Sequence, residues 1–368
     1  MRRAAAAEYG FRKADHSTRA ERSALSRAPG QRLHLLCAQR SRRCLPASEV
    51  VRPWTRNRVL RDEVTSFALG IAGKRQRWTA CCALIACAAV LGACAGDHYL
   101  IYPDRKPIGV ETWSDDVATD HLLIHVRGAR PHGAGPYPAI IVHPEGGKPA
   151  DDMQGIVWDL AAHGYVALAA DYQKRVDGEF QRSMFAWQSP EDATAILNVT
   201  QRYEQIDQQR LGLLGFSQGG VFSLLIAGYA PGRIRAVVSY YPVTDFPRWL
   251  NQAHASLGKR FAFSVIRWYF RRESGAQTDV QFDAVLRAAS PYYVAESIDA
   301  PVLLIHGDSD TTAPLEESQR MAARLTELGK PVELLVVSGG RHIFNFRQPS
   351  QAALAWDATL AWFDKYLR

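Results

Sequence analysis

Cysteine is absent from residues 95–368 of this 368-residue sequence. The six cysteines of the chain all lie earlier, at Cys37, Cys44, Cys81, Cys82, Cys87 and Cys94. A disulfide framework, a metal site with cysteine ligands and a cysteine nucleophile are therefore excluded from residues 95–368.

These residues also lack an excess of positive charge, although the whole chain has a formal net charge of +7. Residues 1–94 hold 18 Lys and Arg against 6 Asp and Glu, whereas residues 95–368 hold 26 against 31. A basic protein can bind nucleic acid or an anionic membrane, but here the basic excess is confined to the N-terminal part. We therefore do not expect nucleic acid as a partner of the folded part.

Residues 1–63 lack the apolar periodicity of a packed helix or strand and are rich in Ala, Arg and Ser. Two interpretations of residues 1–73 stay open. They form a disordered leader, or they lie upstream of the true start of translation and are never made.

An apolar run over residues 78–93 follows the basic residues Lys74, Arg75 and Arg77. A positive segment before about 7–15 apolar residues and a small-residue cleavage site is the layout of a secretory signal. A short transmembrane anchor is the alternative, but the run is shorter than the roughly 20 residues that a spanning helix needs.

The run ends in Leu91-Gly92-Ala93-Cys94, which resembles the lipobox of bacterial lipoproteins. The resemblance implies that residues 74–94 are a signal segment and that Cys94 is lipidated on its thiol and becomes the mature N-terminus. It further implies a protein of the bacterial cell envelope that faces the periplasm and is held by this lipid, with the outer membrane as the expected place. Residues 95–119 are then expected to form a tether, over residues 95–107, and the entry into the fold.

Residues 120–368 alternate short apolar runs with longer amphipathic stretches, which predicts an α/β fold with a mostly parallel sheet and helices on both faces. The expected strands are residues 121–126, 138–142, 165–170, 211–214, 236–240, 302–305 and 332–337. The expected helices are residues 151–163, 190–203, 219–228, 315–328 and 351–366. The alternation breaks once, at residues 246–289, where we expect a helical, lid-like insertion.

The motif that carries chemistry is a short apolar strand that runs into Gly215-Phe216-Ser217-Gln218-Gly219. A serine hydroxyl is a weak nucleophile and must stand exposed at a sharp strand-to-helix turn, where a base can reach it. Small residues two positions to either side permit that turn, and the helix that follows points its positive end at the reacting centre. A tight turn that caps a helix is the alternative, but the position between strand and helix favours Ser217 as the nucleophile.

A nucleophilic serine needs a histidine base and a carboxylate that orients it. In α/β-hydrolases both follow the nucleophile, acid first, each in a loop after a strand. Asp308 and Asp310 follow the strand 302–305, and His342 follows the strand 332–337. His306 and His254 are weaker candidates, because His306 closes a strand and His254 sits in the insertion. Asp310 lies far enough along its loop to turn back toward His342, whereas Asp308 suits a turn.

The oxyanion hole is expected to use the backbone N–H of Gln218 and one N–H from the loop His143-Pro144-Glu145-Gly146-Gly147. Proline has no N–H, so the second donor is expected to be Glu145, with Gly146 next in order. A simple glycine-rich turn is the alternative for this loop.

Several stretches resemble the catalytic domain of prolyl oligopeptidase-type peptidases and the related dienelactone hydrolase-like esterases, of the α/β-hydrolase superfamily. These stretches are residues 215–220, Tyr241-Pro242-Val243-Thr244-Asp245, Ser290-Pro291-Tyr292-Tyr293, residues 301–314 and the loop of His342. The resemblance covers about residues 120–368 and implies that Asp310 is the triad acid.

The departures from these families argue against a transfer of peptidase specificity. The large peptidases carry a β-propeller, for which we expect no room in this chain, and their oxyanion loop usually reads H-G-G where this one reads His143-Pro144-Glu145. Dienelactone hydrolases proper use cysteine at the position of Ser217. We therefore expect a small envelope esterase.

The insertion interleaves the aromatic residues Trp249, Phe261, Phe263, Trp268, Tyr269 and Phe270 with Arg260, Arg267, Arg271 and Arg272. Three interpretations stay open. The aromatic residues line an acyl pocket, the helix rests on a lipid surface, or the helix only packs while its arginines reach into solvent.

The main functional hypothesis is a hydrolase of carboxylic esters that forms an acyl-enzyme and needs neither cofactor nor metal. Its partner is a small-molecule ester or a short peptide. The first alternative is a peptidase or amidase with the same triad, and the second is a non-catalytic lipoprotein that uses a hydrolase fold for binding. A binding module needs none of Ser217, Asp310 and His342, so their joint presence favours an enzyme.

Overall fold

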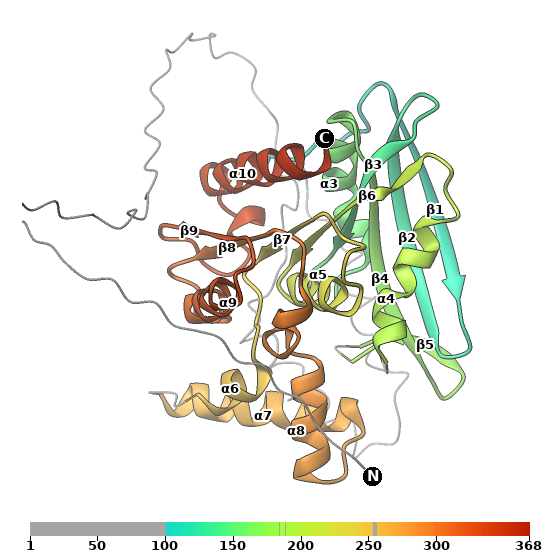
Figure 1. Cartoon of the computed structure of the whole chain (residues 1–368). Coiled ribbons are helices and arrows are strands. Elements are labelled where there is room, and N and C mark those ends of the chain that lie inside the picture. Colours follow the sequence, from blue (N-terminus) through green and yellow to red (C-terminus); the bar gives the residue numbers. More distant parts are fainter. Residues whose placement is uncertain (1–100, 184, 188, 253–255) are drawn as a thin grey trace, which may run out of the picture. The chain divides into compact units, whose positions relative to one another are not determined.

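The computed structural model describes residues 101–368, with the exception of residues 184, 188 and 253–255 (Figure 1). The expected leader, the signal segment and Cys94 lie outside the described residues, as does His254. No helix within the described part of the chain combines the length and the hydropathy that crossing a bilayer requires.

A nine-stranded sheet, in the order β1-β2-β4-β3-β6-β7-β8-β9 with β5 paired to β4, forms the centre of the described residues (Figure 1). The strands are β1 Val110–Ala118, β2 Leu122–Pro131, β3 Tyr137–His143, β4 Val166–Val176, β5 Glu179–Arg182, β6 Ile206–Phe216, β7 Ala236–Tyr240, β8 Val302–Gly307 and β9 Val332–Val337. The strands from β4 through β3 to β9 run parallel, and β1, β2 and β5 add antiparallel pairs. Strands β3, β7 and β8 are apolar runs because both faces of the sheet are covered there.

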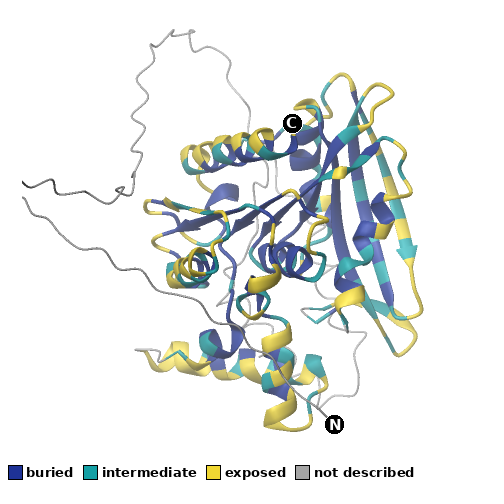
Figure 2. Ribbon diagram, in the orientation of Figure 1, coloured by how far each residue is buried: buried dark blue, intermediate teal, exposed yellow. Residues whose placement is uncertain are grey.

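Helices cover both faces of this sheet. The α-helices outside the insertion are α3 Gln154–Ala162, α4 Pro190–Thr200, α5 Gln218–Tyr229, α9 Leu315–Glu327 and α10 Pro349–Leu367. Helices α3 and α10 share one apolar core with the sheet, and α4, α5 and α9 share the other (Figures 1 and 2). Short 3-10 helices are η1 Ala150–Met153, η2 Pro291–Tyr293, η3 Ala295–Ser297 and η4 Phe344–Phe346. The predicted mostly parallel sheet with helices on both faces is confirmed.

Strand β1 lies within residues 95–119, the segment predicted as tether and entry into the fold. Strand β1 pairs along its whole length with β2, and Tyr102 is already buried, with 4% of its surface exposed. Every residue of β1 after Val110 is partly or fully exposed, and Glu111, Asp115 and Asp116 give the strand a polar character. The strand itself was not predicted, because a solvated edge strand has the composition of a linker.

The hairpin β4–β5 was also not expected, and it brings residues to the site described below. Asp177 and Gly178 connect its strands, both with positive φ angles, 51° and 90°. Asp-Gly is a preferred pair for such a turn, so this signal was present in the sequence.

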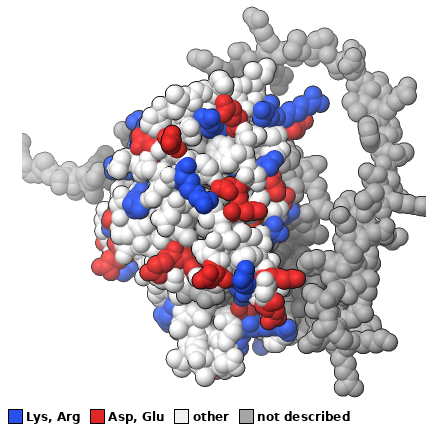
Figure 3. All heavy atoms as spheres, turned by 90° about the vertical axis from the view of Figure 1, so that its right-hand side faces the viewer, with Lys and Arg blue, Asp and Glu red and all other residues white. Residues whose placement is uncertain are grey.

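Charges of both signs alternate over the face that β1 and β2 present (Figure 3). Several of them form ion pairs there, such as Arg130 with Glu111 and Arg202 with Asp115. This face carries no field of a single sign of the kind that nucleic acid binds.

The insertion consists of α6 Phe246–Asn251, α7 Leu257–Ser274 and α8 Asp279–Ala288, so its predicted helical character is confirmed. Side chains of these helices form a third apolar cluster with Val221 and Leu225 of α5. The N–H of Phe246 donates to Ser290 Oγ at 2.9 Å, which joins the two ends of the insertion.

A buried carboxylate fastens the start of the insertion to α9. Glu317 accepts hydrogen bonds from the N–H groups of Thr244 and Asp245, at 3.1 and 3.0 Å, and from the Arg248 guanidinium at 3.0 Å. Removal of any donor would leave part of this buried charge without a partner, which is costly. The insertion is thus held firmly to the body of the domain at its root.

Candidate active site

The candidate site lies at the edge of the sheet where the parallel strands β3, β6, β7, β8 and β9 end. The carboxyl ends of parallel strands share one edge, and loops that follow different strands therefore meet there. Ser217 follows β6, Asp310 follows β8 and His342 follows β9.

Ser217 stands in a strained turn between β6 and α5. Its φ of 52° and ψ of −113° are unusual for a residue with a side chain. A Cβ atom on Gly215 would lie 2.0 Å from the carbonyl oxygen of Gly219, and one on Gly219 would lie 2.1 Å from that of His143. Both small positions of the motif are therefore required by backbone contact, which explains its spacing.

The structure brings Ser217, His342 and Asp310 together in one chain of hydrogen bonds. Ser217 Oγ lies 3.0 Å from His342 Nε2, and His342 Nδ1 lies 2.6 Å from Asp310 Oδ2. A carboxylate only accepts, so Nδ1 carries the proton, and the neutral ring accepts the serine hydroxyl through Nε2. This is the arrangement in which a histidine removes the proton of a serine.

Asp310 is held in place by backbone donors of its own loop. Its Oδ1 accepts from the N–H groups of Thr312 and Ala313, at 2.8 and 3.0 Å, and its side chain is buried. Asp308 instead accepts the N–H of Gly339 at 2.7 Å and is exposed. The structure therefore directs Asp310 to His342, and Asp308 connects the two loops.

Tyr241 is a site residue that the sequence analysis missed. Its ring lies 4.8 Å from the ring of His342 in an edge contact, and its hydroxyl donates to Asn345 Oδ1 at 2.5 Å. Its φ is 39°. Tyr241 follows β7 just as the other site residues follow their strands, and this position was the available signal.

Two other histidines at strand ends are structural. His306 is fully buried, with Nδ1 2.7 Å from Ser318 Oγ and Nε2 2.8 Å from the carbonyl oxygen of Ala313, and burial lowers its pKa. His143 lies between Ser223 and Tyr172, and burial lowers its pKa to about 3. The partners of His143 lie outside the hydrogen-bonded chain of Ser217, whereas His306 Nε2 also lies 3.6 Å from Asp310 Oδ2, behind the acid of that chain.

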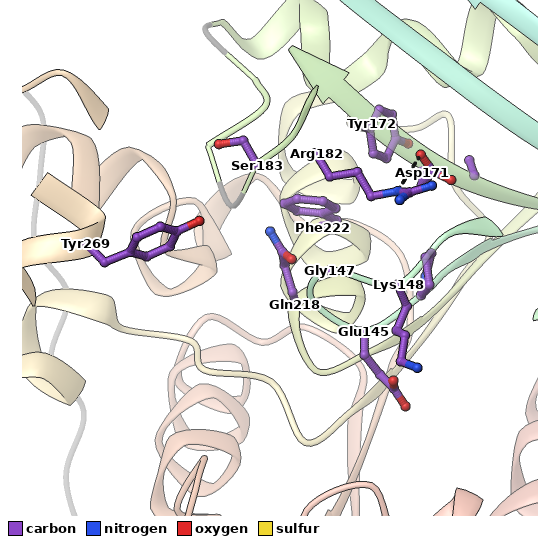
Figure 4. Close-up of a pocket in the computed structure, with 12 residues that line it drawn as sticks. Glu145, Gly147, Lys148, Asp171, Tyr172, Arg182, Ser183, Gln218, Phe222 and Tyr269 are labelled. Carbon is purple, nitrogen blue, oxygen red and sulfur yellow. Dashed lines mark ion pairs between the residues drawn. The ribbon is translucent and has the colours of Figure 1, made fainter. Parts of the chain in front are cut away.

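Gln218 and Glu145, the expected sources of the oxyanion donors, line the same small cavity of about 100 Å³ (Figure 4). Gly146 lies in the exposed turn that follows. Hairpin β4–β5 contributes Arg182, which reaches toward Asp171 at 3.5 Å, and the insertion contributes Tyr269 (Figure 4). Four parts of the chain that are far apart in the sequence therefore line the cavity: the loop of Glu145, hairpin β4–β5, α5 and the insertion.

The carboxyl of Glu145 is buried beside the site, which the sequence analysis did not foresee. Its Oε1 has no hydrogen-bond donor among the described residues. Burial raises the pKa of Glu145 to about 7, and the charges of Lys148, His342 and Arg347 oppose this rise. A buried carboxyl without full hydrogen bonding disfavours its charged form.

A larger cavity of about 510 Å³ lies between α5, the segment before α4 and the insertion. Its apolar wall includes Phe185, Trp187, Val221, Phe222, Leu225 and Phe246. Gln218 and Phe222 line both cavities, so the two share a wall next to the nucleophile. Over the described residues, no group of three or more His, Cys, Asp or Glu side chains is placed to hold a metal ion.

Comparison with known proteins gives matches both to peptidases and to an esterase. The model of the prolyl oligopeptidase family matches residues 179–368, more than half of the chain. The "Uncharacterized peptidase YtmA" of Bacillus subtilis strain 168 is 27% identical over 190 residues, which cover 52% of this chain and 69% of that protein. The "Putative carboxymethylenebutenolidase" of Escherichia coli strain K12 is 26% identical over 282 residues, which cover 72% and 94%.

Solved structures with this fold include the acylaminoacyl peptidase of Pyrococcus horikoshii. The two structures have a TM-score of 0.57 and 21% sequence identity, and the match covers 70% of this chain and 42% of that one. The chain therefore spans less than half of that peptidase. The predicted α/β-hydrolase fold is confirmed.

The first prediction separates the two aspartates of one loop. Asp310→Asn keeps the acceptor for Thr312 and Ala313 but places an amide donor where the Nδ1–H of His342 needs an acceptor. We expect ester turnover to fall by up to roughly 10⁴-fold with little change in melting temperature. Asp308→Asn retains an acceptor for Gly339 and is the matched control, with turnover within a few-fold of the parent. A reversed pattern of activities would exchange the two roles.

The second prediction concerns Glu145 and pH. Its pKa of about 7 in the folded protein lies above its value in the unfolded chain, near 4.3. As pH rises from about 4.5 to 7, the contribution of Glu145 to the free energy of unfolding therefore falls by roughly 3 kcal/mol, because the unfolded chain ionises this carboxyl more easily than the folded protein does. Glu145→Gln lacks this ionisation, so its stability relative to the parent should rise across that window.

Urea unfolding at pH 5 and pH 8 measures this difference. Glu179→Gln, which removes an exposed carboxylate on β5, controls for the general loss of one charge. If the free energies of unfolding of Glu145→Gln and the parent differ by the same amount at both pH values, the raised pKa of Glu145 is contradicted.

Proposed function

The chain belongs to the prolyl oligopeptidase family, and from this membership we propose that it is a serine hydrolase that cleaves carboxylic esters through an acyl-enzyme. The observation that carries the proposal is the hydrogen-bonded chain from Ser217 through His342 to Asp310. Matches to this family and to an esterase relative support the hydrolase class.

In the proposed reaction, Ser217 Oγ attacks the acyl carbon while its proton passes to His342 Nε2. Asp310 holds the other ring nitrogen and stabilises the imidazolium that forms. His342 then gives the proton to the departing alcohol, which leaves the acyl group on Ser217. A water molecule, deprotonated by the same ring, hydrolyses this ester and restores the serine.

The negative charge on the carbonyl oxygen is proposed to be stabilised by backbone N–H groups. Gln218 begins α5, and the positive end of the helix dipole favours an anion there. The loop with Glu145 is pressed against α5, as the His143–Gly219 contact shows. The N–H of Glu145 therefore supplies the proposed second donor, with Gly146 next in order.

The preference for an ester over a peptide rests on the esterase relative and on the cavities. The chain covers 94% of the Escherichia coli relative, whose name specifies a butenolide, a cyclic ester. The apolar cavity of about 510 Å³ suits a hydrocarbon or aromatic acyl group, and the smaller cavity suits a compact polar leaving group. Peptidase activity is the second candidate, supported by the family and by the peptidase name of YtmA.

The third prediction tests the nucleophile and the substrate class. Ser217→Ala should abolish covalent labelling by a fluorophosphonate probe and lower turnover by several orders of magnitude, because the attacking oxygen is lost. Circular dichroism should be unchanged. Normal ester turnover in this variant would falsify the assignment.

A panel of short and long acyl esters beside peptide amides then distinguishes the two candidate functions. We expect kcat/KM to be highest for esters whose acyl group is large and apolar. Phe222→Ala should reduce that preference, because Phe222 lines the larger cavity. A higher kcat/KM for peptide amides than for esters would favour the peptidase.

We further propose that the protein is a lipoprotein of the bacterial envelope, anchored by a lipid on Cys94, as the lipobox-like sequence Leu91-Gly92-Ala93-Cys94 supports. The fourth prediction is that the mature protein partitions into detergent and begins at Cys94. Cys94→Ser should prevent lipidation and processing. Mass spectrometry that finds an unmodified N-terminus at another residue would refute the anchor.

A further inference from the structure

The outer face of α7 carries three large apolar side chains in solvent. Leu257, Phe261 and Trp268 are exposed to 81%, 68% and 48%. Their spacing of four and seven residues places them along one side of the helix. Exposed apolar residues that are scattered singly are ordinary, but an aligned row on one helix indicates a contact surface.

Packing against the domain does not account for the three exposed side chains, because α7 uses a different apolar face for that packing. Phe263, Ile266 and Phe270 on that face are buried in the cluster that joins the insertion to α5. The outer row, Leu257, Phe261 and Trp268, lies on the opposite side of the same helix.

Basic residues flank the outer row, and residues 257–272 contain no acidic residue. The basic residues of this stretch are Lys259, Arg260, Arg267, Arg271 and Arg272. Neither Lys259 nor Arg260 forms an ion pair with a described residue. The first acid of the helix, Glu273, is turned inward, where its carboxylate accepts from Ser183 Oγ at 2.9 Å.

A groove of about 470 Å³ lies between α6 and α7 beside the row. Its lining combines the polar residues Asn251, Gln252, Arg260, Ser264 and Arg267 with the apolar residues Leu250 and Phe263. Ser264 donates to the carbonyl oxygen of Arg260 and Arg267 to Asn251 Oδ1, at 2.9 and 2.8 Å. The guanidinium of Arg260 and the remaining N–H groups of Arg267 are therefore the donors that this groove offers to a phosphate group.

We propose that the outer face of α7 docks on the surface of an anionic phospholipid bilayer, with Leu257, Phe261 and Trp268 at the boundary of the acyl chains and the arginines on the phosphates. A row of Leu, Phe and Trp with Lys and Arg beside it is the pattern of a helix that lies in the membrane interface. Charge complementarity selects an anionic bilayer, because only Arg271 of the five basic residues is offset, by Asp279 of α8, and the other four form no ion pair with a described residue.

The test uses Trp268, the tryptophan of the row. Brominated acyl chains quench the fluorescence of an indole that comes into contact with them, so a loss of fluorescence reports that this side chain has reached the bilayer. The full-length protein is mixed with phosphatidylcholine vesicles that contain brominated chains, with and without phosphatidylglycerol. We expect quenching with the anionic vesicles that Trp268→Phe largely removes, because phenylalanine keeps the apolar contact but not the fluorophore. Trp158→Phe, on α3 at the other face of the sheet, is the matched control and should leave the quenched intensity unchanged.

Two further variants test the chemistry of the surface in the same assay. Phe261→Ser and the double variant Arg260→Gln, Arg272→Gln should each lower the Trp268 quenching several-fold, and added salt should lower it in the parent. Leu354→Ser removes an exposed leucine of α10 and should have no effect.

Three outcomes would overturn the proposal. Vesicle binding with unchanged quenching in Trp268→Phe would show that another segment, such as the basic N-terminal part, makes the contact. Equal quenching with neutral vesicles would remove the role of charge. A dimer in sedimentation that Phe261→Ser dissociates would assign the row to a second copy of the chain.

Discussion

The candidate site exists because the segments that carry its residues approach one another within backbone contact, in two pairs. Gly219 packs on the carbonyl of His143, which brings the loop of Glu145 against the helix that follows Ser217. On the other side, a Cβ atom on Gly307 would lie 2.1 Å from the carbonyl oxygen of Gly340, so the acid loop and the histidine loop also touch. Any side chain at these glycines would separate the groups that must stay within hydrogen-bond reach.

Around this contact, buried polar groups hold the loops in one arrangement. Asp308 joins the acid loop to Gly339, Tyr241 packs its ring on His342, and His306 secures the segment near Ala313. The Asp308 bond joins the loop after β8 to the loop after β9, Tyr241 brings the end of β7 against that histidine loop, and His306 ties the acid loop to its own strand. The imidazole of His342 is therefore positioned by its neighbours as well as by Asp310.

The fold and the central residues of the site could be predicted because they depend on local patterns. Apolar runs of the right length mark β3, β7 and β8, and strand ends followed by Ser217, Asp310 and His342 mark the edge where loops meet. Strand β1 escaped prediction because its exposed charges are typical of a linker. The burial of Glu145 escaped because a glutamate in a glycine-rich loop is ordinarily solvated, and only the packing of distant segments removes water from it.

The hydrogen bond between Phe246 N–H and Ser290 Oγ has a consequence for how such proteins diversify. Since the chain leaves the sheet and returns to it at almost the same point, the segment between these residues can change in length and sequence without disturbing the strand order. Glu317 secures that junction from α9, through the N–H groups of Thr244 and Asp245 before the segment and the guanidinium of Arg248 at its start. Segments of different length and sequence can therefore occupy this position between the same two anchors. Each such segment would give the same scaffold a different substrate cavity and a different outer surface.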